Sequence, residues 1–217
     1  MNIIDIILQL ADGMMVTIMI FVLTLIFSIP LGLVVTTGRM SKNPLIRTIV
    51  KVYISIMRGT PLMLQLLVVY YGPYYLFKCK LSPEYRGIAV IIGFSINYAA
   101  YFAEIFRSGI SSMPVGQYEA AKILGYNKIQ TFFFIILPQV IKRILPAITN
   151  EVITLVKDTS LAFSIAYAEM FSGAKALAAA EKSMLPFVAA AIFYYVFNFA
   201  VATIMELFEE KLNYYDI

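Results

Sequence analysis

Three side chains suited to holding a charged ligand stand close together in one apolar stretch of the sequence. Glu151, Thr154 and Asp158 are three and seven positions apart, so on a helix they share one face. A charged side chain at the middle of a membrane span costs about 2.5–3.5 kcal/mol on insertion scales, and such residues are functional by default. Two carboxylates and a hydroxyl favour a cationic ligand, such as an amino acid with a positive side chain.

A second apolar stretch carries another polar set on one helix face, formed by Asn97, Tyr101 and Glu104. Because successive spans run in opposite directions, the two sets can meet at similar depth and form an acidic pocket. Arginine, lysine or histidine would place both of its cationic groups there. The carboxylate of such a ligand would bind Lys157, a hydroxyl or a helix N-terminus. Lys157 is rotated by about 100° from Asp158, so we do not expect these two neighbours to pair.

Ion pairs that never touch a ligand are the alternative role for the same charges. Glu104 could pair with Arg107 or Arg58. Glu151 or Asp158 could be held by Lys157 from a neighbouring helix. Both roles are compatible with the sequence, since intramembrane ionisable residues pair with one another as well as with substrates.

The elements that position these residues are expected to be membrane-spanning helices in a single domain, residues 1–217. Of the 217 residues, 61% are hydrophobic and only 14% are charged, which excludes a soluble enzyme whose surface must be covered by polar groups. A bilayer core of about 30 Å needs about 20 apolar residues in a helix. Five stretches have that length: Met14–Thr37, Val52–Phe77, Gly87–Phe106, Ile144–Ala168 and Leu185–Met205.

The chain has one cysteine and no histidine, which argues against an internal disulfide and against a His-dependent metal or haem site. We therefore expect the chain itself to bind no cofactor or metal. In the second stretch, Pro61 follows Arg58-Gly59-Thr60 and predicts a kinked helix that lines the path. Gln65, four residues later, is expected to pack between the spans.

Lys and Arg residues set the expected direction of insertion. Gly38–Lys51 and Arg107–Arg143 are the segments richest in basic residues, and the positive-inside rule assigns both to the cytoplasm. Five spans then predict that the N-terminus lies outside and the C-terminus lies in the cytoplasm. The acidic tail from Glu206 to Asp216 is no objection, because acids weigh little in this rule.

The longest cytoplasmic segment, about residues 111–138, predicts two short helices joined at Gly125. Pro114 suits a helix start, Gln117–Leu124 reads as a short helix with its alanines outward, and Gly125 is placed to end it in a left-handed conformation. A second short helix starts near Lys128, and Pro138 limits or kinks it. Two short helices joined in this way would form a projection that could dock in a groove of another protein, although an amphipathic surface turn would also fit the pattern.

The pattern in this segment resembles the EAA loop of permease subunits from binding-protein-dependent ABC importers. The matching positions are Glu119-Ala120-Ala121, Gly125, Ile135, Leu137 and Pro138. Within that group the chain looks like the permeases of the histidine, arginine, glutamine and glutamate uptake class. That further likeness rests on Arg58-Gly59-Thr60-Pro61, Gln65, Ala103-Glu104-x-x-Arg107-x-Gly109-Ile110 and Lys157-Asp158-Thr159-Ser160-Leu161.

The resemblance implies a type I ABC importer permease fold and an importer of polar amino acids, with cationic ones favoured by the acidic stripe. It implies a second permease copy, identical or paralogous, cytoplasmic ATPase subunits, an extracellular solute-binding protein and the cytoplasmic membrane of a prokaryote. ATP and magnesium would bind the partner ATPase, since this chain has no Gly-x-x-x-x-Gly-Lys-Ser/Thr loop. We expect no nucleic acid partner.

By the same resemblance, ATPase coupling falls to the loop residues Glu119, Ala120, Ala121, Gly125 and Pro138. Glu119 could instead only stabilise the first turn of its own helix. The candidate substrate residues remain Asp158, Thr154, Glu151, Asn97 and Glu104. The alternative substrates are glutamine or glutamate. The alternative functions are a secondary transporter or channel, and a membrane scaffold that transports nothing.

Overall fold

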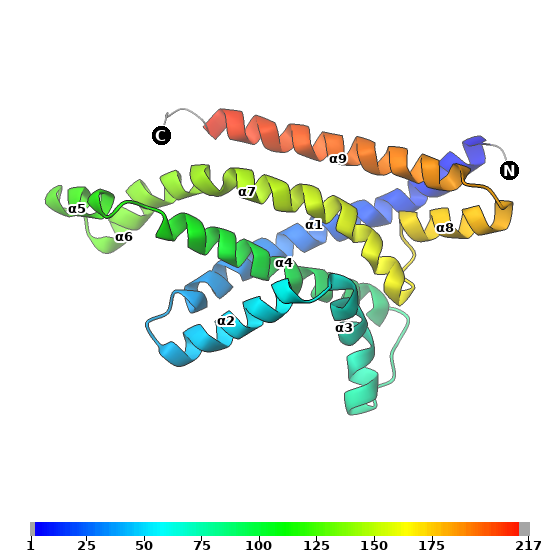
Figure 1. Ribbon diagram of the computed structural model, residues 1–217, viewed down its shortest axis with the longest axis horizontal. Coiled ribbons are helices and arrows are strands. Elements are labelled where there is room, and N and C mark those ends of the chain that lie inside the picture. The colour runs from blue at the N-terminus through cyan, green and yellow to red at the C-terminus, as the bar shows by residue number, and fades with distance from the viewer. Residues whose placement is uncertain (1–2, 213–217) are drawn as a thin grey trace.

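The structure is a computed structural model that describes residues 3–212, and every regular element in this range is helical. Long helices lie side by side along the longest axis (Figure 1). In chain order the elements are α1 (Ile3–Arg39), α2 (Pro44–Gly59), α3 (Leu62–Phe77), α4 (Tyr85–Ser111), α5 (Val115–Ile123), α6 (Lys128–Gln130), the π-helical η1 (Thr131–Ile136), α7 (Leu137–Asp158), the 3-10 helix η2 (Thr159–Ile165), α8 (Met170–Glu181) and α9 (Leu185–Leu212). The predicted all-α fold class is confirmed.

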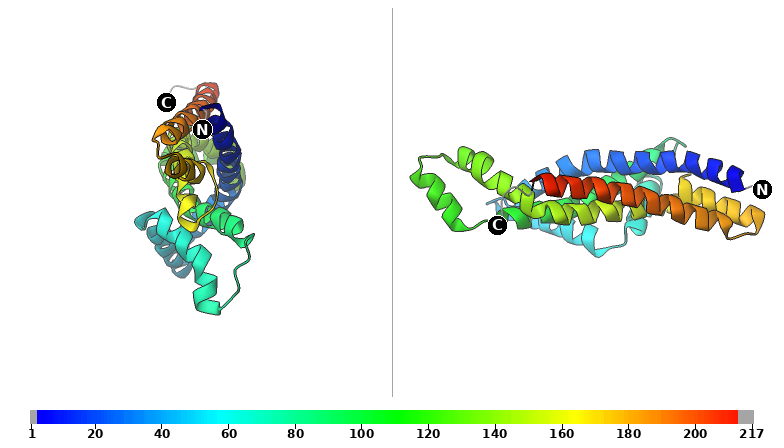
Figure 2. Two further views of the ribbon diagram at one scale, coloured as in Figure 1. Left: turned by 90° about the vertical axis from the view of Figure 1, so that its right-hand side faces the viewer. Right: turned by 90° about the horizontal axis from the view of Figure 1, so that it is seen from above.

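Four helical stretches are long and apolar enough to cross a membrane, and the bent pair of α2 and α3 would be a fifth. They are Ile3–Arg39, Tyr85–Ser111, Lys128–Ile165 and Leu185–Leu212. The expectation of about five spans is therefore confirmed, with helices longer than the sequence stretches. One end of the bundle carries α5 and α6, which we call the loop end; the opposite end carries α8 and the N-terminus, which we call the α8 end (Figure 2).

Helices α1 and α4 pack closely because small residues line their contact. A methyl group added at Gly32 would lie 2.9 Å from Phe102 Cβ, so the two backbones approach closely there. Thr36 Oγ1 donates a hydrogen bond of 3.1 Å to the carbonyl oxygen of Ala103. Small residues at such a contact are typical of helix pairs in membranes.

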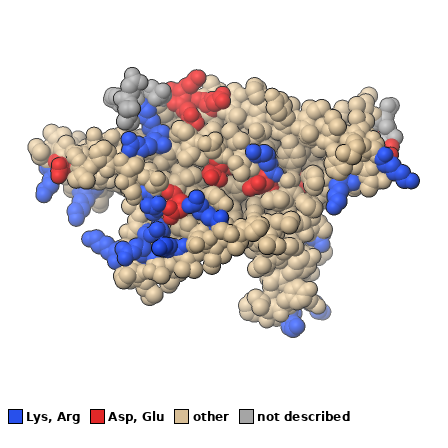
Figure 3. Space-filling view, in the orientation of Figure 1, with Lys and Arg blue, Asp and Glu red and all other residues tan. Residues whose placement is uncertain are grey.

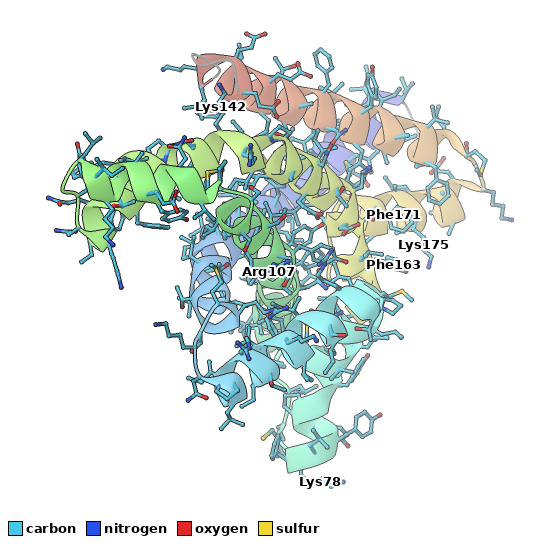
Figure 4. All side chains as sticks on the ribbon, turned by 60° about the vertical axis from the view of Figure 1, so that its left-hand side comes forward. Lys78, Arg107, Lys142, Phe163, Phe171 and Lys175 are labelled. Atoms are coloured by element: carbon cyan, nitrogen blue, oxygen red, sulfur yellow. The ribbon has the colours of Figure 1, made fainter. Side chains whose placement is uncertain are left out.

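The second predicted span is not one kinked helix, and that prediction is wrong. Helix α2 ends at Gly59, α3 begins at Leu62, and the two axes meet at 112°. Thr60 and Pro61 are both extended, since Pro61 has no N–H to continue the helix. Beyond the break, α3 projects from the bundle and Lys78 lies at its far end (Figure 4).

Of the two effects expected of Pro138, a limit on the second short helix is wrong, because the helix that starts near Lys128 does not end there. Helical turns run on from Lys128 through η1 into α7, up to Ile165. In the wider π-helical turn, Leu137 N–H donates to the carbonyl of Phe132, five residues back. This turn comes directly before Pro138, which lies in the first turn of α7, where a missing N–H is tolerated.

Helix α8 lies in a segment, residues 169–184, that the sequence left without an expected element. Glu169 begins it, and its buried carboxylate accepts 2.7 Å hydrogen bonds from the backbone N–H groups of Phe171 and Ser172. Tyr194 Oη on α9 donates a further bond of 3.2 Å to it. Burial raises the pKa of Glu169, and these hydrogen bonds oppose the rise. Glu169 therefore ties α8 to α9 as well as capping it.

Candidate functional site

Asp158 is the last residue of α7, and its carboxylate meets α4 at Tyr98. Tyr98 Oη donates a 2.7 Å hydrogen bond to Asp158 Oδ2. The Tyr98 side chain is buried, whereas the Asp158 side chain is half-buried. Sequence reasoning missed Tyr98; its position three residues before Tyr101 on the same helix was the available signal.

A cleft of about 450 Å³ lies between α2, α4 and the loop-end half of α7. Two of the predicted substrate residues, Glu104 and Glu151, line it. Three guanidinium groups also line it, those of Arg58, Arg107 and Arg143. The cleft therefore offers both signs of charge, which suits a ligand that carries an ammonium and a carboxylate.

Glu104 is ion-paired inside this cleft. Its carboxylate lies 2.7 Å from Arg107 Nη2 and 3.4 Å from Arg39 Nε. The expected alternative of a pair with Arg107 is thus present. Arg58 instead places its guanidinium carbon 5.3 Å from the centre of the Tyr101 ring, a cation–π geometry.

Asn97 is not part of the cleft. Its amide nitrogen donates to the carbonyl of Met57 at 3.1 Å and to Gln65 Oε1 at 2.9 Å. Gln65, buried as expected, donates in turn to the carbonyls of Met57 and Thr60, both at 3.0 Å. These two side chains satisfy carbonyls that the break after α2 leaves free, so Asn97 supports the break.

Thr154 and Lys157 are exposed on α7 and lie apart from the Glu104–Glu151 cleft. Thr154 Oγ1 donates to the carbonyl of Asn150 in its own helix at 2.9 Å. Lys157 lines a different cleft, together with Phe171 and Tyr194. The structure therefore brings Glu104 and Glu151 together, with Asp158 on α7 two turns beyond Glu151.

Charged side chains of both signs gather over the region between α2, α4 and α7 (Figure 3). Arg107 on α4 belongs to this charged face (Figure 4). Lipid hydrocarbon is an unfavourable environment for such a face, because a charged side chain inside a bilayer is costly. It must instead meet protein or water. Among residues 3–212, no group of three or more His, Cys, Asp or Glu side chains is arranged to hold a metal ion.

The loop between α4 and α7 forms a second candidate site at the loop end. Gly125 has a φ of +81°, so the predicted left-handed end of α5 is confirmed. The N–H groups of Gly125 and Tyr126 donate to the carbonyls of Lys122 and Ala121, which closes the last turn. Gln139 on α7 donates to Gln117 on α5 at 3.2 Å and holds the two helices together.

The coupling residues predicted in this loop do not all point outward. Glu119, Ala120 and Pro138 are exposed, but Ala121 is buried, so the expectation that the alanines face outward is wrong for Ala121. Its small side chain is fully buried, in the helix that contacts η1. The sequence reasoning also missed that large apolar side chains of this loop are exposed, among them Val115, Ile123, Leu124 and Ile129. Exposed apolar side chains mark an interaction site where they gather in one patch.

Comparison with known proteins matches residues 28–214 to the family described as "Binding-protein-dependent transport system inner membrane component". The chain is 36% identical over 208 residues to the L-cystine transport system permease protein TcyB of Bacillus subtilis, covering 95% of this chain and 87% of that protein. It is 33% identical over 207 residues to the putative glutamine transport system permease protein GlnP of Rickettsia bellii, covering 95% and 94%.

Among solved structures, an amino acid ABC transporter crystallised with histidines matches with a TM-score of 0.86 and 29% identity, covering 97% of this chain and 99% of that chain. An inward-facing MetNI methionine ABC transporter matches with a TM-score of 0.68 at 14% identity, over 97% and 96% of the two chains. The second likeness concerns the fold alone. Both agree with the type I permease fold expected from the loop motif.

Proposed function

The chain belongs to the family of binding-protein-dependent transport system inner membrane components, as a permease subunit of an amino acid ABC importer, and from this membership we propose its partners, substrate and coupling surface. Two permease subunits, identical or paralogous, form the pathway. Two cytoplasmic ATPase subunits drive it, and an extracellular solute-binding protein delivers the amino acid. ATP and magnesium bind the ATPase subunits.

The cleft with both signs of charge is the observation that carries this proposal. A charged face between α2, α4 and α7 needs a partner or water to cover it, and a second permease copy would supply both by enclosing a water-filled path. The apolar faces of the other helices meet lipid. The complex belongs in the cytoplasmic membrane of a prokaryote, with the loop end in the cytoplasm, the C-terminus there too, and the N-terminus outside.

We assign the substrate to the polar amino acids, with cationic ones favoured. Asp158 and Glu151 supply negative charge along α7, and a neighbouring structure holds histidines. Thr154 and Asn97 would contact substrate only in a different conformation of the pathway. In this structure the Thr154 hydroxyl donates to a carbonyl of its own helix, and the Asn97 amide donates to the Met57 carbonyl at the break after α2. Glutamine remains the alternative, because one relative is named a putative glutamine permease.

ATPase docking is assigned to the loop end. The exposed apolar side chains around Gly125, with Glu119 and Ala120 beside them, form a protruding surface on a rigid turn. A rigid projection can transmit motion of a bound ATPase to α4 and α7, because the loop joins these two helices. A secondary transporter or channel would have no use for such a surface.

Substitution of Gly125 by proline tests the coupling assignment. Proline cannot adopt a φ of +81° and lacks the N–H that bonds Lys122, so the turn must change shape. We expect ATP-driven uptake to be lost in a complex that still assembles. Gly116→Ala is the matched control, because nothing lies within 4 Å of the added methyl group. Unchanged uptake by Gly125→Pro, measured in a normally assembled complex, would overturn the assignment.

A further inference from the structure

Arg86, in the first turn of α4, joins two elements that are far apart in the sequence. Its Nε and Nη2 donate to the Tyr70 hydroxyl on α3, at 3.4 and 3.3 Å. Its Nη1 donates to the carbonyl oxygen of Ala166, just after η2, at 3.1 Å. The guanidinium carbon also lies 5.6 Å from the centre of the Tyr70 ring. The single guanidinium group of Arg86 therefore connects α3 and the end of η2 to the start of α4.

The residues on either side of Arg86 strengthen the same junction. Tyr85 Oη donates to the carbonyl of Val69 on α3 at 2.9 Å. A methyl group at Gly87 would lie 3.3 Å from the Tyr167 ring, so that ring packs directly on the α4 backbone. Three consecutive residues of α4 thus contact α3 or the segment that follows η2. These contacts tie α3, the start of α4 and the segment after η2 to one another.

The 3-10 helix η2, whose end Arg86 contacts, directly follows the candidate substrate residue Asp158. Asp158 ends α7, η2 runs from Thr159 to Ile165, and Ala166 closes η2 with a φ of 54°. A 3-10 segment has poorer hydrogen-bond geometry than an α-helix and often marks a hinge. A left-handed backbone at a non-glycine residue is strained and needs outside support. The bond from Arg86 to the Ala166 carbonyl supplies that support.

We propose that Arg86 is a positioning residue for transport, which holds η2 and α3 together and thereby sets the place of Asp158 in the pathway. The inference rests on the proposed transport function. Arg86 touches no substrate. It acts through η2: with Ala166 fixed, movement of α7 during the ATPase cycle must be taken up at the Asp158 end of the 3-10 segment.

The test compares Arg86→Gln with wild type in vesicles that contain the assembled complex, its ATPase and its binding protein. Glutamine is too short to reach Tyr70 and Ala166 together. Since hydrogen bonds to charged groups are individually strong, we expect uptake per complex to fall about tenfold while ATP hydrolysis continues, so that uptake per ATP falls. Arg86→Lys keeps the charge and one bond, and should restore part of the uptake.

Lys80→Gln is the matched control, because Lys80 is exposed in the same α3–α4 connection and its loss removes the same charge. Tyr70→Phe keeps the ring and removes only the hydroxyl acceptor. We expect it to give a smaller loss of uptake, and the double variant with Arg86→Gln should transport no worse than Arg86→Gln alone.

Two results would overturn the proposal. The first is a fall in assembled complex with unchanged uptake per complex, which would make Arg86 a folding residue only. The second is a parallel fall of uptake and ATP hydrolysis in the Arg86 and Lys80 variants alike. If wild type itself shows no ATP-driven uptake, the proposed function fails, and that outcome is distinct from both.

Discussion

Replacement of Asp158 by asparagine removes a negative charge from the end of α7 while keeping the side chain's size. The Tyr98 hydroxyl donates to Asp158 at 2.7 Å, and it could donate equally to an asparagine oxygen. The change therefore removes the charge and spares the hydrogen bond. A bond between charged groups contributes about 1.5–3 kcal/mol, and since Asp158 is half-buried and screened by water, the lower value applies.

About 1.5 kcal/mol corresponds to a roughly tenfold change in apparent affinity. We therefore expect Asp158→Asn to raise the apparent KM for arginine about tenfold in reconstituted vesicles, and to change the KM for glutamine much less. Asp12→Asn is the control for charge, because Asp12 is exposed on α1. Equal KM values for arginine in wild type and Asp158→Asn would remove Asp158 from the substrate site. An equal rise for both substrates would refute its role in choosing cations.

Two further predictions concern packing and pH. A methyl group at Gly109 would overlap Ile144 Cγ2, so Gly109→Ala should destabilise the α4–α7 contact by about 1–3 kcal/mol and lower the thermal unfolding midpoint, whereas Gly116→Ala should not. Burial raises the pKa of Glu169, between the spans, above its ordinary 4.5, so its stabilising contribution is complete below that pH and is lost as pH rises through the raised value. Glu169→Gln should remove this dependence of the unfolding midpoint as pH rises above 4.5; an unchanged profile would contradict the assignment.

The spans and the loop turn were predictable because each depends on local chemistry. Runs of apolar residues indicated where α1 and α9 lie, although both helices extend beyond those runs. Gly125 could end α5 because glycine adopts a positive φ without strain. Ion pairing of Glu104 was also visible, since Arg107 lies three residues away on the same helix.

The break after α2 and the role of Asn97 could not be predicted, because they depend on contacts between distant segments. Pro61 signalled a disturbance, but the 112° turn requires Gln65 and Asn97 to satisfy the carbonyl of Met57. Nothing in the local sequence pairs residue 57 with residue 97.

The spacing from Tyr101 placed Tyr98 on the polar face of α4, but the contact of Tyr98 with Asp158 again depends on distant segments. A tyrosine in an apolar helix usually packs, and only the position of α7 brings the hydroxyl of Tyr98 to Asp158. The prediction that Ala121 faces outward was wrong because its burial depends on how α5 packs in the folded loop, where α5 contacts η1, and no local pattern encodes that packing.

As a permease subunit, this chain should form the path of an ATP-driven amino acid importer. The most direct measurement is uptake of labelled arginine into vesicles that hold the chain with its co-purified ATPase, with binding protein outside and ATP inside. We expect arginine to accumulate against its gradient, and we expect this accumulation to need both ATP and the binding protein. Equilibration of arginine without ATP, by a chain that retains no ATPase, would contradict it.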